Sequence, residues 1–221
     1  TSAVDRALWM ESDRMGYLLP VLTQRRFDTQ REVVLNERRQ SYENRPYGLA
    51  TTALMAALFP PEHPYHWMPI GSPDDLRAAC LDQARQFFAA YYHPANASVT
   101  LAGDIDTGRA HELVSRYFEE IPAGSPPPPV TIPEVPAAGV ERRLLLEDRV
   151  ELPRLYLAWR TPALFAPGDA ALDLLGEILG GGKASRLYRR LVHDRRIATD
   201  VHAGQASRER SGIFSIVATA A

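Results

Sequence analysis

Apolar residues recur with helical spacing over most of the first half of the chain. The clearest stripe falls within residues 107–118, where apolar side chains follow one another at intervals of three or four: Ala110, Leu113, Val114, Tyr117 and Phe118. Similar spacing predicts further helices over residues 3–19, 28–44, 49–58 and 72–91. Asp28 and Ser72 are suitable N-caps for two of them. Cys80 lies on the apolar stripe of the helix that Ser72 begins, which predicts a buried, inert thiol.

Short apolar segments predict the strands. They lie at residues 97–102, 140–147, 154–161, 200–207 and 212–219. Two more helices are predicted at 168–179 and 184–194, and the glycines at 180–182 end the first of these. The mixture of helices and strands predicts an α+β fold.

A proline-rich segment interrupts this pattern at residues 122–139. Its run of four prolines favours an extended, semi-rigid backbone, so we interpret it as an interdomain linker or a surface strap. The sequence is therefore divided into a domain over residues 1–121, a linker over 122–139 and a second domain over 140–221.

The composition excludes several classes of protein. Hydrophobic residues make up 45% of the chain and charged residues 24%, as in ordinary globular proteins. The formal net charge of −2 does not favour nucleic acid or an anionic membrane as a partner. One cysteine rules out an intrachain disulfide and a cysteine-rich zinc module. The chain holds no apolar run long enough to span a bilayer.

Glu37 is the carboxylate that the pattern marks out. On a helix it shares a face with Val33 and Val34, and Gln30 lies two turns before it. A carboxylate on an apolar face costs free energy unless a cation or strong donors meet it. The alternative is a surface glutamate paired with a nearby arginine. A single acid is a weak metal signal, so spacing alone leaves both interpretations open.

The remaining polar motifs favour structural roles. The six histidines are scattered, and each is more consistent with a cap or an exposed position than with a metal ligand. The glycines at 180–182 follow a helix and lack the spacing of a phosphate-binding loop. Asp104 and Asp106 fit a turn and a helix cap. A G-x-S-x-G nucleophile motif is absent from the sequence.

Several segments match one family in order and with plausible spacing. They are ALWMESDRMGYLL, FDTQREVVLNERRQSYENRPYG, HPYHWMPIGSPDDL, FFAAYYHPANASVTLAGDID, RYFEEIP, LGGGKASRLYRRLVHDRRIATDV and GIFSIVA. Together they cover essentially the whole chain, which resembles the insulinase/pitrilysin family of zinc metallopeptidases. The resemblance implies two related domains, each a mostly antiparallel sheet layered with helices. Both domains are expected to be incomplete in this chain. His63 and His93 lie in family segments and are expected to be scaffold residues.

The resemblance also implies a metal site. In this family a His-x-x-Glu-His motif on one helix supplies two zinc ligands and the general base, and a glutamate on a later helix completes the site. Glu37 falls at that third-ligand position, whereas Gln30 replaces a second glutamate that many members carry. His-x-x-Glu-His does not occur in the 221 residues, and only 36 residues precede Glu37. We therefore expect no catalytic residue in this chain, no bound zinc and no peptidase activity from the chain alone.

The resemblance implies that this chain is part of a zinc-dependent metalloendopeptidase, which hydrolyses peptides or unfolded polypeptide segments and holds Zn²⁺ in the complete protein. The expected partners are a peptide substrate and a homologous subunit or second copy, and resemblance to bacterial members favours the periplasm. Related processing peptidases have a glycine-rich, substrate-contacting loop at the position of Gly180, Gly181 and Gly182. The first alternative is a non-catalytic sister subunit that binds substrate or a partner. The second is a structural or interaction module unrelated to peptidases.

Overall fold

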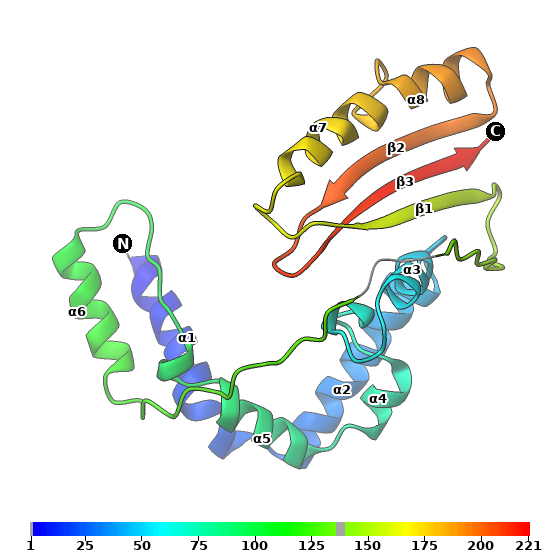
Figure 1. Ribbon diagram of the computed structural model, residues 1–221. Coiled ribbons are helices and arrows are strands. Elements are labelled where there is room, and N and C mark those ends of the chain that lie inside the picture. Colours follow the sequence, from blue (N-terminus) through cyan, green and yellow to red (C-terminus); the bar gives the residue numbers. More distant parts are fainter. Residues whose placement is uncertain (1, 136–139) are drawn as a thin grey trace. The chain divides into compact units, whose positions relative to one another are not determined.

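A computed structural model describes residues 2–135 and 140–221 (Figure 1). The last four residues of the predicted linker, 136–139, lie outside the described residues. The chain forms two compact units. The first contains the residues up to Glu37 together with Ile70–Thr131, and the second contains Arg38–Pro69 and the chain from Ile132 onward.

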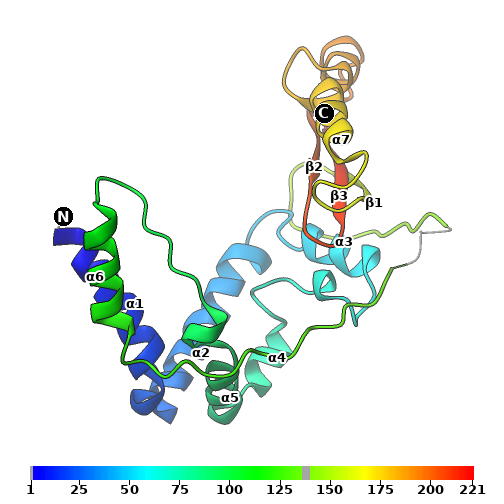
Figure 2. The same cartoon turned by 60° about the vertical axis from the view of Figure 1, so that its left-hand side comes forward.

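The second unit is built on a three-stranded antiparallel sheet in the order β1-β3-β2. Its strands are β1 (Arg154–Thr161), β2 (Ala198–Ala206) and β3 (Gly212–Ala220). One face carries α7 (Asp169–Gly180) and α8 (Arg186–Tyr188), followed by the π-helical η4 (Arg189–Asp194); Figures 1 and 2 show α7 running along the sheet. A Cβ on Gly180 would overlap the backbone nitrogen of Ala203, and one on Gly176 would lie 3.0 Å from the Cα of Gly204. These glycines allow α7 to approach β2 closely.

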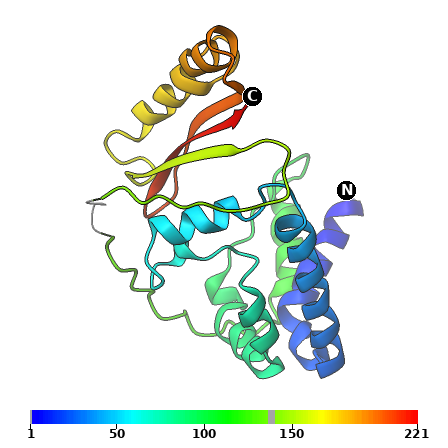
Figure 3. The ribbon, with the colours of Figure 1, turned by 90° about the vertical axis from the view of Figure 1, so that its right-hand side faces the viewer.

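The opposite face of this sheet packs against α3 (Ala50–Leu58), which lies beside β1 in Figure 3. Met55 and Phe59 form a buried cluster with Ile213 of β3, and Ala158 of β1 packs against it. Alternation along a strand explains the arrangement, because Ile213 points to the face opposite the α7 contact. A short 3₁₀ helix, η2 (Pro64–His66), follows α3.

The first unit is helical. Its elements are α1 (Ser2–Val21), most of α2 (Gln24–Arg38), α4 (Pro73–Ala78), α5 (Leu81–Tyr91), the 3₁₀ helix η3 (Pro94–Asn96) and α6 (Thr107–Phe118). α1 and α6 lie side by side, with Leu8 and Leu113 buried. The Asp106 carboxylate caps α6 by accepting the Arg109 N–H, which confirms the predicted cap.

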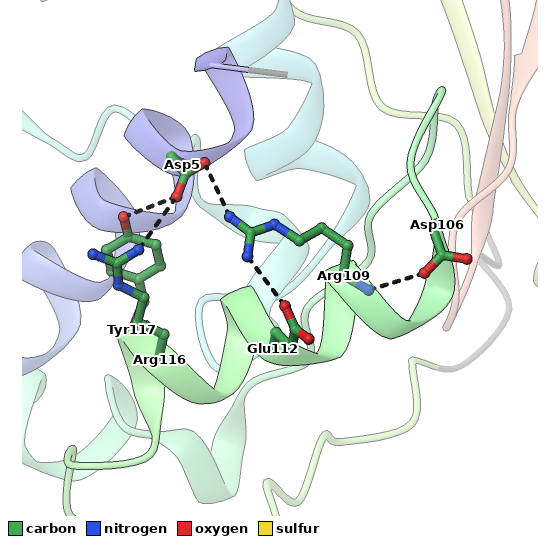
Figure 4. Close-up of polar contacts among 6 residues, drawn as sticks. All are labelled: Asp5, Asp106, Arg109, Glu112, Arg116 and Tyr117. Carbon is green, nitrogen blue, oxygen red and sulfur yellow. Dashed lines mark hydrogen bonds and ion pairs between the residues drawn. The ribbon is translucent and has the colours of Figure 1, made fainter.

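A polar cluster joins α1 to α6 at the surface (Figure 4). The Asp5 carboxylate lies 3.9 Å from the Arg109 guanidinium and 4.0 Å from that of Arg116, and it accepts a hydrogen bond of 3.3 Å from the Tyr117 hydroxyl. Arg109 also pairs with Glu112 at 3.1 Å. These groups are partly exposed, so the cluster orients two helices that apolar contacts already hold.

The α+β class is confirmed, and most predicted elements are present. Two strand predictions were wrong: residues 97–102 and 140–147 form no strand. In the described part of the chain neither segment has a neighbouring strand to pair with. An apolar pattern shows that a segment could form a strand, but it does not show whether a pairing partner exists. The helix predicted over 72–91 is broken, because Ala79 and Cys80 are extended and begin α5 afresh. Cys80 is therefore exposed rather than buried.

The predicted division at 122–139 stays a prediction. The compact units are divided differently, since residues 38–69 group with the chain that follows residue 131. The physical reason is that Met55 of α3, and Phe59 directly after this helix, belong to the same buried core as Ile213 of β3 and pack against Ala158 of β1. The composition along the sequence does not indicate that residues near 55 contact a strand more than 150 residues later.

Candidate functional site

Glu37 lies in the last turn of α2 and its side chain is exposed. The prediction that it shares a buried apolar face was wrong: Val33 is 49% exposed, and the buried residues of this helix end are Leu35 and Arg38. The sequence argument failed because the apolar pair Val33–Val34 does not mark the packed side. Within the described residues the Glu37 carboxylate makes no hydrogen bond or ion pair, so its oxygens are open to an incoming cation.

The backbone after Glu37 changes from α-helix to π-helix. The π-helical η1 spans Arg39–Glu43 and continues α2 without a break. Arg38 is buried, its Nε lies 3.2 Å from the Glu43 carboxylate, and its guanidinium lies 5.7 Å from the centre of the Tyr42 ring. Single π-helical turns within helices often occur at functional sites. Gln30, two turns before Glu37, is exposed as well.

The described residues do not by themselves make a zinc site. They contain no group of three or more His, Cys, Asp or Glu side chains placed to hold a metal ion. A protein zinc site takes three or four such ligands. Glu37 would supply one, so any zinc chemistry needs ligands from outside the described chain.

The histidines are occupied by structural contacts or are exposed. His63 is buried, stacks on Phe59 with ring centres 4.7 Å apart, and accepts the Tyr65 N–H at Nδ1. Burial lowers the pKa of His63, and the Arg160 charge adds to this. The Nδ1 of His66 lies 2.7 Å from the carbonyl oxygen of Phe59.

His93 is buried and links two segments of the first unit. Its ring nitrogens lie 3.0 and 3.1 Å from the carbonyl oxygens of Ala123 and Ala90. A Cβ on Gly124 would overlap the imidazole ring, so this glycine is required beside it. The scaffold roles predicted for His63 and His93 are confirmed. The exposed positions predicted for the other histidines are also confirmed for His111, His193 and His202.

The three glycines at the end of α7 have different environments. Gly180 is buried against β2, as described above, and ends the helix. Gly181 and Gly182 are exposed. Gly182 has φ +98°, in the left-handed region, and nothing lies within 4 Å of a Cβ built on it. Contact with a substrate is thus open to Gly181 and Gly182, whereas Gly180 serves packing. Their substrate role stays a prediction.

Sequence reasoning missed a buried carboxylate at the start of α7. Asp169 accepts hydrogen bonds from the Phe165 N–H at 2.8 Å, and from the Gln205 amide and the Ser207 hydroxyl at 2.5 Å each. The Ser207 bond, followed by that of Phe165, lowers the pKa of this carboxyl. The network ties the β1–α7 loop to the end of β2. Its only sequence signal is an acid directly after Pro167-Gly168, which is typical of any helix start.

A wide groove within the second unit contains neither Glu37 nor the glycine triplet. Its volume is about 2500 Å³, and its lining includes Tyr47, His63, Asp148 and Arg154. This exceeds the volume of an ordinary enclosed ligand pocket, so the groove is open surface. Acidic and basic side chains both line it, without a bias toward one charge.

Comparison with known proteins decides the family. The family described as "Peptidase M16 inactive domain" matches residues 80–221. The zinc protease PqqE of Helicobacter pylori is 30% identical over 219 residues, which cover 97% of this chain and 48% of that protein. The chain belongs to the peptidase M16 family. This confirms the resemblance to insulinase/pitrilysin-type peptidases.

Solved structures agree with the M16 assignment. A protease from Helicobacter pylori is 30% identical with a TM-score of 0.88, and the match covers 100% of this chain and 53% of that one. The periplasmic protease PqqL of Escherichia coli is 18% identical with a TM-score of 0.73, covering 99% and 24%, which shows the shared fold. The chain spans about half the length of the two Helicobacter pylori proteins. Among the described residues, no helix is both long and apolar enough to cross a bilayer.

Proposed function

We propose that this chain is part of an M16 zinc metalloendopeptidase and that Glu37 supplies one of three zinc ligands. The observation that carries the proposal is the Glu37 carboxylate itself, which is exposed and engages no described partner. The family resemblance, which implies that Glu37 falls at the third-ligand position, and the 30% identity to a zinc protease support it. An exposed carboxylate on a helix is a suitable oxygen ligand, because it can bind a metal without first breaking an ion pair.

The residues present in this chain determine which roles it would have in the proposed zinc site. Glu37 would bind and orient the metal, while two further ligands and the general base come from outside this chain. Bound zinc would polarise the scissile carbonyl and acidify a water molecule. Gly181 and Gly182, exposed at the end of α7, would offer backbone groups to an extended peptide. The chain alone is proposed to bind no zinc and to cleave nothing.

The test is metal analysis of the longer protein that contains this chain. In Glu37→Gln we expect zinc content and peptide cleavage to fall together, because an amide oxygen is a much weaker zinc ligand than a carboxylate. Loss of an outer-shell partner already costs about 10–100-fold in metal affinity, so loss of a ligand is expected to cost at least that much. Glu32→Gln is the matched control, since Glu32 is also exposed on α2. Unchanged zinc in Glu37→Gln would remove the ligand role.

A second candidate is a non-catalytic sister subunit of the same family, which binds substrate or a partner. The matching family over residues 80–221 is described as an inactive domain, which favours this candidate. The coding sequence ahead of Thr1 separates the two: His-x-x-Glu-His there supports the peptidase, and a corresponding helix without it supports the subunit.

Partners and location form part of the proposal. We propose a peptide substrate, together with a homologous subunit or a second copy of the protein. The E. coli neighbour is described as periplasmic, which supports a periplasmic location. Cell fractionation with an antibody to this chain tests the location, and recovery in the cytoplasm alone would contradict it.

A further inference from the structure

Tyr47 has a backbone conformation that a bulky residue rarely adopts. Its φ is +59°, in the left-handed region, and it follows the π-helical end of α2. Gly48, the next residue, cannot carry a side chain, because a Cβ would overlap the carbonyl oxygen of Tyr42. A hydrogen bond of 2.9 Å from the Gly48 N–H to the Arg45 carbonyl closes the turn. A conformation this unfavourable persists only where the surroundings enforce it.

Three contacts hold Tyr47, and all lie within the second unit. Its N–H donates to the Asp148 carboxylate at 2.8 Å, and its hydroxyl donates to the Leu152 carbonyl at 2.7 Å. The Arg154 guanidinium lies over the ring, 3.7 Å from its centre. Arg154 in turn donates through Nε to the hydroxyl of Thr219, a buried residue of β3, at 2.9 Å. Tyr47 therefore connects the turn after η1 to the start of β1, and Arg154 extends the connection to β3.

We infer that Tyr47 is a positioning residue for the end of α2 that carries Glu37. α2 and η1 form one uninterrupted helix from Gln24 to Glu43, and Glu37 lies within its last turns. Because the helix is continuous, holding Tyr47 restrains the C-terminal turns of this helix, in which Glu37 lies. The inference rests on the proposed function for the ligand role of Glu37, whereas the clamp itself rests on the contacts of Tyr47.

The clamp is tested first on the 221-residue chain by amide hydrogen exchange. In Tyr47→Phe, which removes only the hydroxyl, we expect exchange over residues 39–48 to accelerate about fivefold, the effect of losing one hydrogen bond. Tyr156→Phe is the matched control, because the Tyr156 hydroxyl makes no hydrogen bond within the described residues. Exchange in Tyr47→Phe equal to that of the unchanged chain would overturn the clamp.

The positioning role is tested in the longer protein by zinc competition against a chelator. We expect Tyr47→Phe to weaken zinc binding by about threefold to fivefold and Glu37→Gln to weaken it far more. The visible spectrum of the cobalt-substituted protein should also shift in Tyr47→Phe, since it reports ligand geometry, which a mere loss of stability would leave unchanged. Weakening by Glu37→Gln alone would overturn the positioning role and keep the proposed ligand. No weakening by Glu37→Gln would overturn the ligand proposal and the positioning role with it.

Discussion

The two units of the chain differ in how their elements are held together. In the second, α7 and α3 pack on opposite faces of the sheet, and glycines allow backbone to approach backbone at the α7–β2 contact. In the first, helices meet through a few buried leucines and a partly exposed ion cluster at Asp5. Close backbone packing tolerates little change, whereas exposed charges tolerate much. The comparison teaches that substitutions of similar size should have very different effects in the two units.

Gly180→Ala should have the largest effect. The added methyl would overlap the Ala203 backbone, which cannot move without displacing β2, so we expect a loss of about 3 kcal/mol or more in the free energy of unfolding. Urea unfolding measures it, with Gly204→Ala as the matched control because nothing lies within 4 Å of a Cβ there. Equal midpoints for the two variants would show that the α7–β2 contact is looser than described.

Sequence reasoning predicted the elements of this second unit better than its contacts. The strands predicted at 154–161, 200–207 and 212–219 follow from the apolar pattern, which is local, and the structure confirms all three. The close approach of Gly180 to Ala203 and the Asp169 network depend on residues that only folding brings together. In the first unit, the helical pattern singled out Glu37, the family resemblance implied its role as a zinc ligand, and that role stays a prediction. Its helix face was misjudged, because Val33 is apolar and yet half exposed.

Asp169→Asn should have an intermediate effect, since it weakens three hydrogen bonds that cross between loops of the second unit. In the unchanged chain, folding lowers the pKa of the Asp169 carboxyl. The stability that this carboxylate contributes is therefore complete above the ordinary carboxyl pKa and is lost as the pH falls through the lowered value. We expect Asn to lower the thermal midpoint at pH 7, and the difference from the unchanged chain to shrink toward pH 3.

Asp173→Asn is the matched control, because Asp173 is an exposed acid on the same helix. A difference between Asp169→Asn and the unchanged chain that stays constant from pH 7 to pH 3 would contradict the network's role. Calorimetry across this pH range provides the measurement.

Asp5→Asn should have the smallest effect. The Asp5 carboxylate is 37% exposed and meets two arginines at 3.9 and 4.0 Å, distances at which a surface ion pair contributes about 0–1 kcal/mol. Asn keeps an oxygen for the Tyr117 hydroxyl, so the loss is the electrostatic part alone and should vanish in about 1 M salt, where the screening length is about 3 Å. Trp9 on α1 reports this unit once Trp67 and Trp159 are replaced by Phe. In that background Asp13→Asn is the control, an exposed acid of α1 outside the cluster. A loss of more than about 2 kcal/mol, or one that salt does not reduce, would mean that this cluster anchors α1 to α6 as firmly as close packing anchors α7 to β2.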